Sequence, residues 1–271
     1  MSSHTSFRAD LHCHTTFSDG SFTPEELIVH AKTIGLSALS ITDHDTVEAY
    51  GVAKEVAKKE GLLLGTGVEF SSYDDEISVH ILGYDIDLDD PGLAALCSRH
   101  LSRRLERNSK ILENLKKQKM PLSEEILEKG HIIGRVHIAT EMIKKGYVQT
   151  HKEAFQRFLG EGKVCYVPGP RISVEETISV IQGAKGKAFL AHPHLLGEGK
   201  VLRKLLEKPF DGLECYYCRS TYDQQRRILK LAKERNLLIS GGSDFHGVFR
   251  KEAPLGCSWV DEETFKKIFK S

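Results

Sequence analysis

Histidines and acidic residues stand at the ends of short apolar runs throughout this 271-residue chain. The stretch ADLHCHTTFSDG places His12 and His14 two residues apart and Asp19 five residues further on. Comparable positions recur downstream, at His44, Glu69, His80, His192, Asp244 and His246. Imidazole and carboxylate groups together suit divalent cations such as Zn²⁺, Mn²⁺ or Fe²⁺. These nine side chains exceed the needs of one tetrahedral ion, so they predict a cluster of two or three ions with a bridging carboxylate.

The elements that must carry these residues alternate between strand and helix up to about residue 87. A predicted strand at about 7–12 precedes a helix that opens at TPEEL, where Thr23 and Pro24 are a helix start signal. LSALSIT predicts a second strand, followed by a helix over about 46–60. LLLGTGVEF and ISVHILGYDI then predict a hairpin. This order favours an α/β fold with a largely parallel sheet or barrel.

The stretch 88–163 differs in character, because it is charged, has helical periodicity and contains no convincing strand. We therefore expect a helical insertion over 88–163 and one α/β domain formed by 1–87 and 164–271. KVCYVP predicts a strand, and from there onward strands and helices alternate again. In parallel α/β barrels the carboxyl ends of the strands meet on one face, which is where active sites form. The histidines and carboxylates are expected to converge there.

Composition narrows the possible partners. Lys plus Arg and Asp plus Glu number 38 each, so no overall field draws the chain to long nucleic acid or to a membrane. Neither a run of 18 apolar residues nor a secretory signal pattern is present. The six scattered cysteines are typical of reduced thiols, and we expect a cytoplasmic protein. The oligomeric state is not predictable from the sequence.

Five motifs give the sequence a resemblance to a known family. DLHCHTTFSDG, ITDHD, GVEFS with HILGY, AHP and GGSDFHG resemble the successive motifs of the PHP (polymerase and histidinol phosphatase) superfamily, across residues 10–247. The chain is most similar to a subgroup whose helical insertion contains GRPHIA. Here the motif is GRVHIA at 134–139, with Val136 in place of the proline. That subgroup acts on nucleoside 3′,5′-bisphosphates or on the 5′ ends of short RNA.

The resemblance implies a distorted (β/α)7 TIM-like barrel with a trinuclear metal site. One ion would be held by His12, His14, Glu69 and Asp244. A second would share Glu69 and add His80 and His192. The third would use Asp19, His44 and His246.

Further residues are implied to support the site or the substrate. Asp43 and Asp45 would orient imidazoles. The 88–163 insertion would cap the substrate, and Arg135 and His137 would bind its phosphate. Arg107 is a further candidate for phosphate binding, although an ordinary solvated helix face explains it equally well.

The function implied is that of a hydrolase, a metal-dependent phosphoesterase. It would remove a phosphate from a small nucleotide, such as a nucleoside 3′,5′-bisphosphate, using a metal-bound hydroxide and no protein nucleophile. The alternatives are a 5′-3′ exoribonuclease on short 5′-phosphorylated oligonucleotides and a histidinol phosphatase, which GRVHIA disfavours. A non-catalytic metal-binding PHP module is less favoured, because all nine ligand positions hold competent residues. A metal-dependent amidohydrolase would be expected to carry a lysine at a strand end, and none stands there.

Overall fold

Strands and helices alternate along much of the chain in the computed structural model, which describes residues 6–128, 132–169, 171–196 and 199–270. The predicted mixed α/β class is confirmed. The chain divides into two compact units, one formed by residues 1–96 with 172–271 and the other by 97–171. None of the helices in the described ranges is long and apolar enough to cross a membrane.

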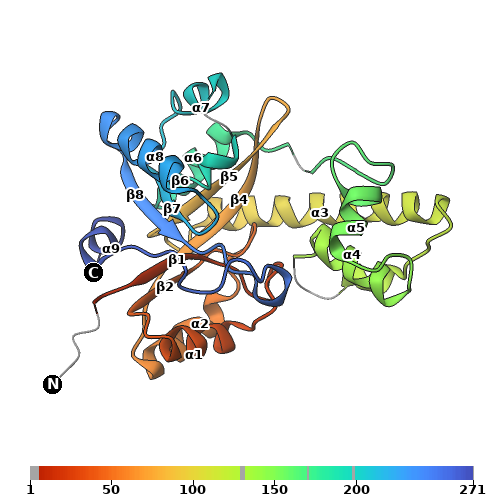
Figure 1. Cartoon of the computed structure of the whole chain (residues 1–271), viewed down its shortest axis with the longest axis horizontal. Helices are drawn as coiled ribbons and strands as arrows, with labels where there is room; N and C mark the ends of the chain where they lie inside the picture. The colour runs from red at the N-terminus through yellow and green to blue at the C-terminus, as the bar shows by residue number, and fades with distance from the viewer. Residues whose placement is uncertain (1–5, 129–131, 170, 197–198, 271) are drawn as a thin grey trace. The chain divides into compact units, whose positions relative to one another are not determined.

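The first sheet is parallel and has the strand order β1-β2-β3. Its strands are β1 (Ala9–Cys13), β2 (Ala38–Ile41) and β3 (Leu63–Gly65). Two helices connect them and lie side by side in Figure 1, α1 (Pro24–Thr33) and α2 (Tyr50–Glu60). Leu27 and Ile28 of α1 pack with Leu39 and Ile41 of β2 in one buried core. Thr23 caps α1 as predicted, because its hydroxyl accepts from the Glu26 N–H.

The second sheet has the strand order β4-β5-β6-β7-β8. Its strands are β4 (Gly67–Asp74), β5 (Ile77–Tyr84), β6 (Lys187–Leu190), β7 (Gly212–Tyr217) and β8 (Leu238–Gly242). The predicted hairpin is present as β4 and β5, which pair antiparallel, as do β5 and β6. β6, β7 and β8 are parallel. The helices of this half are α6 (Val174–Gly183), α7 (Lys200–Leu205), α8 (Tyr222–Glu234) and α9 (Glu262–Ile268), with 3-10 turns at Pro193–Leu196 and Gly247–Phe249.

The strand pairing of the described residues leaves two open sheets and does not form one closed barrel. Isolated bridges still join them, from Cys13 to Phe245 and from His44 to Glu69. Gly242 permits a close approach of β8 to β1, because a Cβ at this position would lie 2.4 Å from the backbone nitrogen of His12. The ends of the two sheets are therefore brought together at the residues that carry the histidines.

The unit formed by residues 97–171 is helical. It contains most of α3 (Pro91–Lys117), together with the 3-10 helix η1 (Glu124–Glu128), α4 (Arg135–Lys144), α5 (His151–Ala154) and the π-helical turn η2 (Phe155–Leu159). The predicted strand at KVCYVP is wrong, because this segment is irregular. Its Cys165 is buried with Ile111 and Met142 in the core of this unit, and its N–H donates to the Phe158 carbonyl. The apolar residues of KVCYVP thus serve helix packing and not a sheet.

One disulfide joins Cys218 and Cys257, whose Cα atoms are 5.7 Å apart. This differs from the expectation that all cysteines are reduced. The two residues are 39 positions apart, so their spacing gave no sign of the pairing. Cys13, Cys97, Cys165 and Cys215 keep their thiols.

We predict that the Tyr50 hydroxyl stabilises the junction of three strands. Its oxygen lies 2.8 Å from the carbonyl oxygens of Ile41 and Gly65, and it accepts from the Gly67 N–H at 2.7 Å. Tyr50→Phe leaves these buried groups without that partner, so the free energy of unfolding should fall by about 1–3 kcal/mol in urea denaturation. The control is Tyr222→Phe, at a side chain that is 78% exposed. Equal stability of the two variants would contradict this role.

Candidate metal centre

Glu69 of β4 lies at the centre of the histidine cluster and is 1% exposed. Its Oε1 is 2.9 Å from the Nδ1 of His80 and 3.0 Å from the Nε2 of His192. Its Oε2 lies 3.1–3.2 Å from three further ring nitrogens, in His12, His14 and His44. One carboxylate therefore meets five imidazoles that come from four separate segments of the chain.

Asp244 follows β8 and approaches the same ring nitrogens of His12 and His14 as Glu69 does. Its Oδ1 is 3.3–3.5 Å from ring nitrogens of His12, His14 and His246. Its Oδ2 accepts a hydrogen bond from the Tyr217 hydroxyl at 2.8 Å and pairs with the Arg250 guanidinium. The two oxygens therefore have different partners, since Oδ2 binds the Tyr217 hydroxyl and the Arg250 guanidinium, while Oδ1 faces the histidines.

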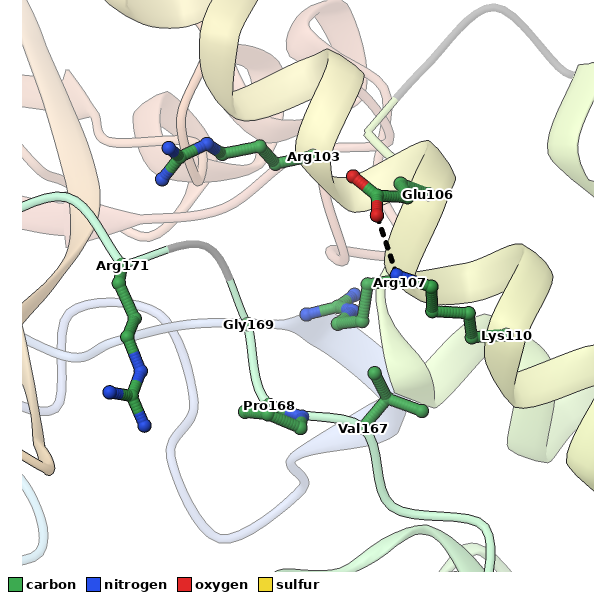
Figure 2. A pocket seen from close by; sticks show the side chains of 8 residues that line it. All are labelled: Arg103, Glu106, Arg107, Lys110, Val167, Pro168, Gly169 and Arg171. Atoms are coloured by element: carbon green, nitrogen blue, oxygen red, sulfur yellow. Dashed lines mark hydrogen bonds and ion pairs between the residues drawn. The ribbon is translucent and has the colours of Figure 1, made fainter.

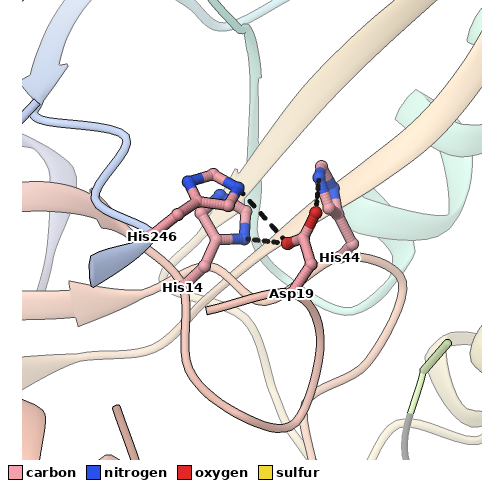
Figure 3. A group of neighbouring side chains, drawn as sticks. All are labelled: His14, Asp19, His44 and His246. Atoms are coloured by element: carbon pink, nitrogen blue, oxygen red, sulfur yellow. Dashed lines mark ion pairs between the residues drawn. The ribbon is translucent and has the colours of Figure 1, made fainter. Parts of the chain in front are cut away.

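Asp19 faces a second group of histidines, shown in Figure 3. Its carboxylate oxygens lie 3.2 Å from the Nε2 of His246, 3.7 Å from the Nδ1 of His14 and 3.8 Å from the Nε2 of His44. The tight turn behind it depends on Gly20, where a Cβ would lie 2.3 Å from the His14 carbonyl oxygen. The turn therefore folds back over the end of β1 and carries the Asp19 carboxylate to the cluster.

The ring nitrogens at the centre of the cluster lack hydrogen bonds. Among the described residues of this cluster, four buried ring nitrogens have no hydrogen-bond partner, although each lies within 3.2 Å of a carboxylate oxygen. They are Nε2 of His12, His14 and His246 and Nδ1 of His44. Buried polar atoms without partners require an explanation, and a bound ion is one. Nitrogen lone pairs and carboxylate oxygens that converge in this way match the donor set of a divalent cation.

Three overlapping groups of side chains have ligand atoms within 4.8 Å of one another. The first comprises His12, His14, Glu69 and Asp244. The second comprises His14, Asp19, His44 and His246. The third comprises His44, Glu69 and His80, and His192 lies against the same Glu69. The structure thus brings together all nine residues that the sequence singled out as metal ligands.

The carboxylates of the cluster are ionised. Burial alone would raise the pKa of Glu69, but the imidazoles of His12 and His80 hold it well below its usual range. Asp244 and Asp19 have lowered pKa values for the same reason, since neighbouring histidines outweigh the effect of burial. Three carboxylates with lowered pKa values therefore lie close together, an arrangement that suits a bound cation.

The histidines respond to this environment in different ways. Burial lowers the pKa of His44 to about 3, so its ring is neutral and keeps a lone pair. Burial also opposes a charge on His14, but the nearby Asp244 and Glu69 raise its pKa to about 9. Protons and metal cations would compete for such a nitrogen.

Two buried carboxylates of the site were missed by sequence reasoning. Glu214 of β7 has an Oε1 2.8 Å from the Nδ1 of His12, and its Oε2 accepts from the His192 N–H at 2.6 Å. Asp10 accepts from the N–H groups of Ser243 and Gly256, which follow β8. The available signal was an acidic residue inside an apolar strand, as in GLECYY, because a buried carboxylate requires partners.

Asp43 and Asp45 anchor the loops around the cluster. Asp43 accepts from the Thr15 N–H at 2.7 Å and from the Ser18 hydroxyl at 2.5 Å. Ser18 in turn lies 3.4 Å from the Nδ1 of His14, so Asp43 acts on that ring through Ser18. Asp45 accepts from the N–H of Ser71 in β4 at 2.7 Å.

The predicted phosphate-binding residues lie in the helical unit. The Nδ1 of His137 accepts from the Gly134 N–H at the start of α4. The Arg135 guanidinium lies 5.4 Å from the ring centre of Tyr166 and donates to a backbone carbonyl. Arg107 donates to the Oδ1 of Asn108 through Nε and Nη2. Their binding of substrate stays a prediction.

Comparisons with known proteins also point to metal-dependent hydrolysis of phosphate esters. The PHP domain family matches residues 10–171. The 5′-3′ exoribonuclease Rnm of Escherichia coli is 34% identical and covers 93% of this chain and 87% of its own. The 3′,5′-nucleoside bisphosphate phosphatase of Chromobacterium violaceum is 31% identical over 88% of this chain and 86% of its own. A structure from Bifidobacterium adolescentis, described as a metal-dependent phosphoesterase, superposes with a TM-score of 0.88 at 31% identity and covers 96% of this chain and 94% of its own.

We expect Glu214 to stabilise the site even without metal. Glu214→Ala leaves the His12 ring and the His192 N–H buried without their acceptor, so the free energy of unfolding in EDTA should fall by about 3 kcal/mol. Glu214→Gln keeps one acceptor and should lose less. Glu234→Ala removes an exposed carboxylate on α8 and serves as the control. If urea denaturation gave the same midpoint for Glu214→Ala and Glu234→Ala, the proposed support of His12 would be wrong.

Proposed function

Since this chain belongs to the PHP family, we propose that its histidine–carboxylate cluster holds two or three divalent ions and uses them to hydrolyse nucleotide phosphates. The chain is a hydrolase, a metal-dependent phosphoesterase. The observation that carries the proposal is the contact of Glu69 with five imidazoles, beside four buried ring nitrogens that have no hydrogen-bond partner in the described residues.

Each ion is assigned a ligand set. His12, His14, Glu69 and Asp244 would hold the first. Glu69 would also ligate the second ion, together with His80 and His192. Asp19, His44 and His246 would hold the third. Mixed imidazole and carboxylate ligands suit Mn²⁺, Fe²⁺ and Zn²⁺.

The chain's own residues set the conditions for hydrolysis. Bound ions of this kind lower the pKa of water and polarise phosphoryl oxygens. Glu214 fixes the His12 ring through Nδ1, which directs its Nε2 toward Glu69 and Asp244. The Arg250 and Tyr217 side chains hold the second oxygen of Asp244.

We assign no protein nucleophile to the reaction. Cys13 lies between two proposed ligands, but it is fully buried in the apolar core. Burial, reinforced by Asp10, raises the pKa of its thiol well above the usual range. A protonated, enclosed thiol is not available for attack on phosphorus.

The proposed substrate is a small phosphorylated nucleotide or a short oligonucleotide. One relative is named for nucleoside bisphosphates and another for 5′-3′ exoribonuclease action, and both substrates present a phosphate ester on a ribose. We propose that the 88–163 insertion caps the substrate and that the two sheets together form a distorted (β/α)7 barrel around the site. The bridges from His44 to Glu69 and from Cys13 to Phe245 join the two sheets and support this barrel arrangement.

The proposed function predicts metal-dependent turnover. The Mn²⁺-loaded protein should release phosphate from adenosine 3′,5′-bisphosphate or mononucleotides from 5′-phosphorylated tetra-adenylate, and EDTA should abolish both. His14→Ala removes a proposed ligand of the first ion and should lower turnover at least about 100-fold. His30→Ala, which leaves the cluster intact, is the matched control. A chain that binds Mn²⁺ yet turns over neither substrate would contradict the proposal.

A further inference from the structure

A second site candidate lies within the helical unit and shares no residue with the histidine cluster. It is a cavity of about 300 Å³, which is small for a ligand pocket. Figure 2 shows its lining, with one wall from α3 and the other from residues 167–169 and Arg171. The charged lining residues are Arg103, Glu106, Arg107, Lys110 and Arg171.

The α3 wall is one face of the helix. Residues 103, 106, 107 and 110 follow the spacing of three, four and seven residues that places side chains on one side. In Figure 2 the guanidinium groups of Arg103 and Arg107 extend from α3 toward the side on which Arg171 lies. The sequence pattern of these α3 residues is also typical of a solvated helix face, but in the structure their side chains line a cavity.

The charge of the pocket is strongly positive although the whole chain is neutral. Four cationic side chains and one carboxylate line it, so the formal charge of the lining is +3. The Glu106 carboxylate pairs with Lys110, with an Nζ–Oε1 distance of 2.5 Å. Such a local excess of arginine and lysine attracts anions.

One of the arginines is fixed before any ligand binds. Arg107 is 9% exposed, and its Nε and Nη2 donate to the Asn108 Oδ1 at 3.1 and 2.9 Å. Asn108 is fully buried and donates to the Ile133 carbonyl at 2.8 Å. A guanidinium held in this way loses little conformational entropy on binding, and its planar fork matches the oxygens of a phosphate.

We propose that this pocket binds a backbone phosphate of an oligonucleotide, beyond the ester that is hydrolysed. This inference rests on the proposed function, because it takes the bound oligonucleotide to be a substrate of the metal centre. No aromatic ring is among the described lining residues, so the pocket offers charge and hydrogen-bond donors but no surface for base stacking. Contacts of this kind position a nucleic acid without reading its sequence.

The test measures binding by the full-length chain in EDTA, where no hydrolysis occurs. The probe is a 5′-phosphorylated tetra-adenylate with a 3′-fluorescein, followed by fluorescence anisotropy, with unlabelled adenosine 3′,5′-bisphosphate as competitor. The variants are Arg103→Ala with Lys110→Ala and, from the facing segment, Arg171→Ala. The control, Lys116→Ala with Lys117→Ala, removes two exposed charges from the same helix. Circular dichroism melting curves check that each variant folds.

We expect each pocket variant to weaken tetra-adenylate binding roughly tenfold, and tetra-uridylate binding equally. The dependence of log affinity on log salt concentration should become shallower by about 0.7 for each lost phosphate contact. The affinity for the bisphosphate, measured by competition, should fall much less in these variants than the affinity for the oligonucleotide.

Three results would overturn the proposal. They are unchanged oligonucleotide binding, an equal loss in the Lys116 and Lys117 control, or an equal loss for the bisphosphate, which would assign the pocket to a terminal phosphate. Hydrolysis is measured separately in Mn²⁺. If the wild type hydrolysed neither substrate, the proposed function would fail, while the EDTA comparison would still decide the pocket.

Discussion

The structure depends on placing one buried carboxylate, Glu69, among five imidazoles. Glu69 is only 1% exposed. Burying an ionised carboxylate costs free energy unless positive or polarisable partners surround it. Those partners come from β1 and its following turn, from the loop after β2, from β5 and from the end of β6. The sheets must therefore meet at these strand ends, and the bridge between His44 and Glu69 lies at that meeting point.

A layer of hydrogen bonds behind the imidazoles holds this arrangement in place. Glu214 fixes the back of the His12 ring, and Asp10 ties β1 to the loop after β8. Asp43 closes the turn that carries Asp19. These groups would not touch a bound ion, but each determines where a ligand atom points. Such groups commonly determine the affinity of a metal site.

The sequence was sufficient to predict the ligand candidates, because metal-binding side chains at strand ends form a pattern that few other constraints produce. It predicted less well where tertiary packing decides. KVCYVP has the composition of a strand, yet Cys165 packs into a helical core. Glu214 was missed because its role depends on His12, 202 residues away. The Cys218–Cys257 disulfide and the two open sheets likewise depend on contacts between distant segments.

We propose that Glu69 is a ligand shared by two ions, and the metal content of the protein measures this most directly. The chain would be reconstituted with Mn²⁺, passed through gel filtration and measured by inductively coupled plasma mass spectrometry. Glu69→Gln is compared with Glu76→Gln, an exposed position in the turn of the same hairpin. We expect two or three ions in the wild type and the control, and at most one in Glu69→Gln. Equal metal content in Glu69→Gln and the wild type, or none in the wild type, would contradict it.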